Sequence, residues 1–155
     1  MGTYEDKFKP AQANWQPNGV DGITIVFVNM PNSSNYLHWR RDGNMLQIIG
    51  GLVASGAFSF YPNLLLPVGI TIDESLIVAD QNALGTAFAI ITGNRKAGVV
   101  HLANSNTNAV RFTGDSIPTA INPINNGIWA PSKPAVWASG DQLGFSFSVP
   151  IVEWA

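Results

Sequence analysis

Apolar and polar residues alternate most clearly near the C-terminus of this 155-residue chain. From Leu143 to Val149, a large apolar residue occupies every second position, and glycine or serine fills the positions between. Successive side chains of a β-strand point to opposite faces of the sheet, so the pattern predicts a strand with one apolar face and one nearly bare face. Because chain ends fray unless they are tied down, we expect this strand and Trp154 to be docked in a sheet or against a neighbouring subunit. The large apolar residues are Leu143, Phe145, Phe147 and Val149.

A β-hairpin is predicted around the segment YLHWRRDGNMLQIIGGL. Residues 36–41 form its first expected strand, and the second begins at Met45. Asp42-Gly43 lies between them, and this dipeptide supplies the positive φ values that tight hairpin turns require. The turn is therefore expected over Asp42-Gly43.

Other short apolar runs, bounded by turn residues, predict further strands. Gly22–Val28 is rich in β-branched residues and is expected to form a strand buried on both faces. Pro62 and Pro67 indicate that a strand within residues 57–67 lies at an edge or bends. Three more strands are predicted within residues 84–116, with turns at Gly93–Gly98 and Asn104–Asn108.

Helix signals are confined to residues 73–85, where Asp73 is a candidate N-cap but the apolar residues keep a helical period for little more than one turn. Residues 116–134 are rich in proline, asparagine and serine and predict a long loop or crossover. Short strands without βα alternation predict an all-β fold, either an antiparallel β-sandwich or a jelly roll. We expect one such domain over residues 15–155, preceded by a polar arm or lead-in over residues 1–14.

The composition changes this picture through its low charge. Only 12% of the residues are charged, against about 25% in a typical soluble domain. The chain has either an uncharged surface of Asn, Ser, Thr and Gln or buried subunit interfaces, and we favour the interfaces because permanent interfaces resemble a domain core cut in half. A net charge of −2 and a pI near 5.5 argue against a nucleic-acid partner. No apolar run is long enough for membrane insertion.

Candidate catalytic and metal-binding groups are few, and the absence of cysteine excludes disulfides, thiolate catalysis and cysteine-ligated zinc. Gly114-Asp115-Ser116 superficially matches the nucleophile block of one esterase family, but no histidine follows it, so we interpret it as a turn. His38 and His101 lie in predicted strands and are expected to be hydrogen-bonded wall residues; three subunits could still place copies of one histidine around an axis. The carboxylates of Asp73, Glu74 and Asp80 are expected to be solvated. We therefore predict no catalytic, metal or cofactor-binding residues.

Ligand-binding candidates lie in the loop at residues 116–134. Among five tryptophans, most are expected in the core or at interfaces, but Trp129 lies within this loop, where a ligand could reach it. With Asn125 and Asn126, Trp129 forms the candidate receptor-binding set, because binding residues concentrate on scaffolded loops.

Three segments together resemble the C-terminal tip or knob domains of trimeric bacteriophage tail fibres and tail needles. YLHWRRDGNMLQIIGGL is similar to that family's aromatic-x-x-Arg-x-Gly-Asp/Asn hairpin, and LLLPVGITID to its Leu-Pro-x-Gly-Ile/Leu-x-Ile-Asp segment. VWASGDQLGFSFSVPIVEWA is similar to its closing Trp-x-x-Gly-Asp, amphipathic strand, Pro-Ile and C-terminal tryptophan. The chain departs from the pattern by Val68, between the proline and the glycine, and by its longer loop at residues 116–134.

The resemblance implies a jelly-roll β-sandwich, assembled as a homotrimer at the tip of a virion appendage. Phe145, Phe147 and Trp154 would then serve trimer or C-terminal docking. The implied partners are a host cell-surface glycan or protein receptor and other virion tail or capsid proteins. The alternative is a purely structural knob or decoration protein of the virion that binds no receptor. An enzyme, such as a polysaccharide-cleaving spike, is not expected.

Overall fold

The computed structural model describes residues 14–77, 83–103, 108–114 and 128–155. These residues form one curled antiparallel sheet of nine strands, in the order β1-β3-β4-β9-β6-β7-β8-β5-β2, and no α-helix occurs among them. No helix in the described part of the chain is long and apolar enough to cross a membrane. Because the described residues form strands and no α-helix, the all-β prediction is confirmed.

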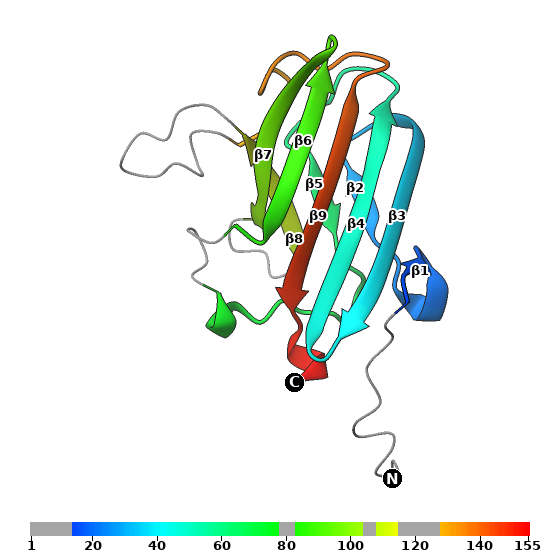
Figure 1. Cartoon of the computed structure of the whole chain (residues 1–155), viewed down its shortest axis with the longest axis vertical. Coiled ribbons are helices and arrows are strands. Elements are labelled where there is room, and N and C mark those ends of the chain that lie inside the picture. Colours follow the sequence, from blue (N-terminus) through cyan, green and yellow to red (C-terminus); the bar gives the residue numbers. More distant parts are fainter. Residues whose placement is uncertain (1–13, 78–82, 104–107, 115–127) are drawn as a thin grey trace.

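The elements alternate between long strands of the front of the sheet and short strands behind it (Figure 1). The strands are β1 (Gln16–Pro17), β2 (Val26–Val28), β3 (Asn32–Asp42), β4 (Met45–Ala54), β5 (Asn63–Leu65), β6 (Gly85–Ile91), β7 (Asn94–Leu102), β8 (Ala109–Gly114) and β9 (Gln142–Pro150). Three single-turn 3₁₀ helices are η1 (Val20–Gly22), η2 (Glu74–Leu76) and η3 (Val152–Trp154).

The curl of the sheet brings β8, β5 and β2 behind the front strands, and the core lies between (Figure 1). Phe145 of β9 contacts strands behind the front of the sheet. The centroid of its ring lies 5.5 Å from that of Phe112 on β8 and 6.1 Å from that of Phe27 on β2. β8 and β2, which both lie toward one end of the sheet order, thus share one core with β9.

The alternating C-terminal segment forms β9, which pairs with β4 on one side and β6 on the other. Its large apolar side chains are all buried, whereas Ser146 is exposed. The prediction of one apolar and one bare face is confirmed, and the apolar face belongs to the core of the chain itself. The buried residues are Leu143, Phe145, Phe147 and Val149.

The predicted hairpin is β3–β4, but its turn lies one residue later than expected. Asp42 pairs with Met45, so the two loop residues are Gly43 and Asn44. Gly43 has a φ of 60°, as the first loop position of a type II′ turn requires. Asp42-Gly43 correctly indicated a turn, but Asp42 itself is still part of β3, where it pairs with Met45.

Two other local predictions need correction. Only Val26–Val28 of the segment Gly22–Val28 forms a strand, and Val26 is 46% exposed because the segment covers the core from one side only. The turn expected at 93–98 is confined to Thr92-Gly93, since β7 begins at Asn94. The Asp73 cap is confirmed: its side chain accepts a hydrogen bond from Ser75 N at 3.1 Å, and the helix is the single turn η2, in agreement with the short helical period.

The motif Trp-x-x-Gly-Asp has a clear structural role at the start of β9. Trp137 is buried and stacks on Phe58 with a centroid distance of 4.2 Å. Gly140 takes a φ of 92°, a conformation that favours glycine. The Asp141 carboxylate then accepts hydrogen bonds from Ala138 N at 2.8 Å and Thr92 N at 3.0 Å. It thereby joins this turn to the β6–β7 turn.

Candidate functional site

The clearest candidate site lies on the face of the front strands that points away from the core. The strand register places Tyr36, Gly51, Gly144 and Phe88 in one row across β3, β4, β9 and β6. Two aromatic residues thus flank two glycines on neighbouring strands. The two glycines leave the sheet without side chains there, and each ring packs over one of them.

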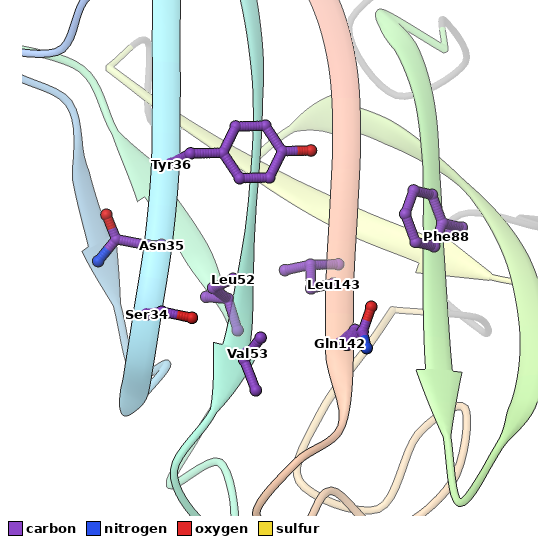
Figure 2. A pocket seen from close by; sticks show the side chains of 8 residues that line it. All are labelled: Ser34, Asn35, Tyr36, Leu52, Val53, Phe88, Gln142 and Leu143. Atoms are coloured by element: carbon purple, nitrogen blue, oxygen red, sulfur yellow. The ribbon is translucent and has the colours of Figure 1, made fainter.

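Tyr36 covers Gly51. A Cβ atom added at Gly51 would lie 3.0 Å from Tyr36 Cε1 and 2.6 Å from the Leu143 carbonyl oxygen, closer than packed carbon atoms approach. Only glycine therefore lets the ring rest on the sheet. Figure 2 shows the face of this ring, which lies over the sheet next to β9. Of the whole residue, 51% remains exposed.

Phe88 takes up the side-chain position that Gly144 leaves empty. A Cβ atom at Gly144 would collide with Cε1 and Cζ of the Phe88 ring. The Arg95 guanidinium lies 4.5 Å from the centroid of the same ring, which is cation–π geometry. Phe88 is therefore held between strand β9 and an arginine, and it forms a fixed wall.

Between the rings is an open pocket of about 190 Å³. Figure 2 shows Ser34, Val53 and Gln142 on the side of the pocket away from the Tyr36 ring. No lining residue is charged, so the pocket combines aromatic surface with neutral hydrogen-bonding groups. The lining residues are Ser34, Asn35, Tyr36, Leu52, Val53, Phe88, Gln142 and Leu143.

Comparisons of the chain with protein-family models, curated proteins and solved structures found no match. The function therefore has to be inferred from the chemistry of the chain. The pocket holds no pair of carboxylates and no nucleophile with a neighbouring base, which are the arrangements of most hydrolytic sites. Aromatic surface beside neutral hydrogen-bonding groups is a lining that ligand-binding pockets share.

The expectation that Trp129 is exposed in a loop is wrong. Only 1% of this residue is exposed, and its ring packs near Phe112 and Trp137, with centroid distances of 5.9 Å and 6.1 Å. Gly98 and Gly114 form a slot for the indole on the core side of β7 and β8; a Cβ atom at Gly98 would lie 2.6 Å from Trp129 Cζ2. A ligand cannot reach a ring inside this slot.

Asn125 and Asn126, the other members of that set, lie outside the described residues. Phe145 and Phe147 are 4% and 3% exposed, in the core of their own chain. Of the two roles expected for them, trimer contact or C-terminal docking, this burial fits docking within the chain and not a contact with a second subunit. β8 and β2 lie against the apolar face of β9, where Phe112 and Phe27 pack near the Phe145 ring.

Trp154 is docked, as expected, but on its own chain. It packs against the core and under the Arg41 guanidinium, 4.8 Å from the ring centroid. Val152 N donates to Thr71 O at 2.9 Å, and Thr71 N donates to a Glu153 carboxylate oxygen at 2.9 Å. The hydrogen bond from Thr71 N is the main reason that the pKa of Glu153 is lowered.

The remaining candidates do not come together as a site. His101 is buried, with Nδ1 2.9 Å from Leu102 O, and His38 is half-buried on another strand. Asp73 caps η2, Glu74 is exposed, and Asp80 and Ser116 lie outside the described residues. Within residues 14–77, 83–103, 108–114 and 128–155, no group of three or more His, Asp or Glu side chains could hold a metal ion.

Sequence reasoning missed the Tyr36–Phe88 pocket, although it had noticed the bare face of β9. The missing information was the register between strands, which sets Gly51 beside Gly144 and a ring on either side. Glycine inside two strands is the signal, because it marks places where another group approaches the backbone closely.

Proposed function

We infer that this chain is a tip or knob domain of a bacteriophage tail fibre or tail needle, and that it attaches the virion to a receptor on the host cell surface. The domain is a β-sandwich of jelly-roll type that assembles as a homotrimer. The receptor is a glycan or a protein, and other virion tail or capsid proteins hold the domain in place.

One observation carries the proposal: the three segments that resemble this family are neighbours in the fold. β4, from the first segment, pairs with β9, from the third, through nine residue pairs from Met45–Pro150 to Val53–Gln142. The second segment lies beside the C-terminal end of β9. There Ile72 forms a bridge with Ile151, and Asp73 N donates a hydrogen bond to Pro150 O at 2.8 Å. Segments distant in sequence thus build one unit that includes the C-terminus.

The low charge of the chain and its exposed apolar side chains support trimerisation. Val26 and Leu65 are cross-strand partners on β2 and β5, and they are 46% and 39% exposed. Their strands lie behind β9 in Figure 1. Because both side chains are exposed, they face away from the core, on the opposite side from the Tyr36–Phe88 pocket. A subunit contact through β2 and β5 leaves the pocket open to a receptor.

Two measurements on the purified chain test the proposal. Light scattering coupled to size-exclusion chromatography is expected to give the mass of three chains. The same preparation is expected to bind susceptible bacteria and to compete with whole phage for adsorption, with avidity from three copies. A monodisperse monomer contradicts the trimer, and a trimer that neither binds nor competes on the true host favours the purely structural knob. Release of soluble sugar from the cell envelope would instead indicate an enzyme.

A further inference from the structure

We propose that the pocket between Tyr36 and Phe88 binds one uncharged pyranose unit of a cell-surface glycan. The inference rests on the proposed attachment function, because a host-cell glycan is one of its two receptor classes. It assigns the binding site to the front strands, away from the loop at residues 116–134.

The Tyr36 ring is suited to stacking against a sugar. It rests on Gly51, where a Cβ atom would approach its Cε1 to 3.0 Å, and half of the residue is exposed. The face of an aromatic ring carries partial negative charge, so it attracts the weakly positive C–H groups that line one face of a pyranose. Because the sheet already holds the ring, little side-chain freedom is lost when a sugar binds.

Hydroxyl-binding groups lie beside this platform. The Ser34 hydroxyl and the Gln142 amide line the pocket together with the Tyr36 ring (Figure 2), and both residues are exposed. An amide offers two N–H donors and a carbonyl acceptor, and a hydroxyl both donates and accepts. These groups match the hydroxyls of a sugar, each of which also donates and accepts.

Charge and size narrow the ligand further. No charged side chain lines the pocket, so an acidic sugar would lose hydration there without gaining a counter-charge. Arg95, whose guanidinium lies 4.5 Å from the Phe88 ring centroid, is not among the residues that line the pocket. The volume of about 190 Å³ is below the ~300–1,000 Å³ of pockets for drug-sized ligands, which fits a single sugar ring.

The test follows the amide resonances of Leu52 and Leu143, which line the pocket on β4 and β9, while sugars are added to the whole chain. The probes are methyl glucoside, methyl galactoside, methyl mannoside and N-acetylglucosamine, with glucuronic acid and N-acetylneuraminic acid as acidic comparators. At least one neutral sugar is expected to shift both resonances, with a dissociation constant in the millimolar range, as suits one small ligand in an open site.

Three variants connect the shifts to the ring. Tyr36→Ala is expected to weaken binding of the neutral sugar about tenfold, the upper end of what one aromatic contact contributes. Tyr36→Phe keeps the stacking face and is expected to stay within about threefold of the unaltered chain. Phe60→Ala truncates another exposed aromatic residue, 58% exposed and outside the pocket lining, and is expected to change nothing.

Several results overturn the assignment: no shift with any neutral sugar, tighter binding of the acidic sugars, or unchanged binding by Tyr36→Ala. A shift of the Leu52 and Leu143 resonances with protein concentration alone would make the face a subunit contact and would also overturn the assignment. Adsorption separates this inference from the attachment function. If Tyr36→Ala binds cells as well as the unaltered chain, the attachment function stands and the pocket assignment fails. If sugars bind at Tyr36 but no cells are bound, the pocket assignment stands and the attachment function fails.

Discussion

Glycine residues determine where aromatic side chains lie in this molecule. Gly51 and Gly144 admit Tyr36 and Phe88 to the outer face, whereas Gly98 and Gly114 admit Trp129 to the core. The same device therefore produces an open ring in one place and a buried ring in the other. The two cases differ in the face of the sheet on which the glycine lies, because neighbouring positions along a strand face opposite sides.

The ionisation of Glu153 is coupled to folding. Its pKa is lowered from 4.5, first by the backbone hydrogen bond from Thr71, so the carboxylate stabilises the fold at neutral pH. That contribution is present above pH 4.5 and is lost as the pH falls through the lower pKa of the folded state. Glu153→Gln is expected to lower the thermal unfolding midpoint slightly at neutral pH, and the difference from the unaltered chain should vanish in acid.

The control for this pH effect is Glu74→Gln, which removes an equal charge from an exposed position in η2. Its midpoint is expected to follow that of the unaltered chain at every pH. A difference for Glu153→Gln that persists below the folded-state pKa would mean that the amide disturbs η3 sterically, and the electrostatic explanation would then be wrong.

At the scale of elements, the β3–β4 hairpin depends on one backbone conformation. Gly43 has a φ of 60° and open space around its missing side chain, so any penalty for a larger residue comes from the backbone. Gly43→Val is expected to lower the free energy of unfolding by about 1–3 kcal/mol, because a β-branched residue is strained at positive φ. Denaturant unfolding measures this difference.

Gly56→Val is the matched control, because Gly56 also has open space around it but lacks a positive φ. It is expected to change the stability much less than Gly43→Val. Equal effects of the two substitutions would remove the link between Gly43 and the turn conformation.

The elements that the sequence predicted best are those governed by local chemistry. The alternation of β9, the glycine turn of the hairpin and the Asp73 cap each depend on residues close together in the chain. The fate of Trp129 and the Tyr36–Phe88 pocket depended on which strands pair and in what register. Periodicity within one strand carries no information on that register, so a proline-rich neighbourhood wrongly suggested an exposed tryptophan.

On the scale of the whole molecule, residues 153 and 154 are held by other elements of the same chain. Trp154 and Glu153 bind elements of their own chain, the β3–β4 hairpin and the segment before η2. The core side chains of β9 are likewise covered from within. The subunit contacts of the proposed trimer would therefore use other surfaces, and two exposed apolar positions on opposite sides of the sheet distinguish the possibilities.

Leu65 and Ile49 provide that comparison, because they are 39% and 38% exposed. Leu65 lies on β5, beside Val26, while Ile49 lies on β4, on the same outer face as Gly51. If subunits meet through β2 and β5, Leu65→Arg places an unpaired charge in the interface, which costs several kcal/mol. We expect Leu65→Arg to reduce the mass in light scattering from three chains toward one and to keep a β-type circular dichroism spectrum. Ile49→Arg should remain a trimer; if it dissociates while Leu65→Arg does not, the front strands form the subunit contact and the pocket is closed to glycans.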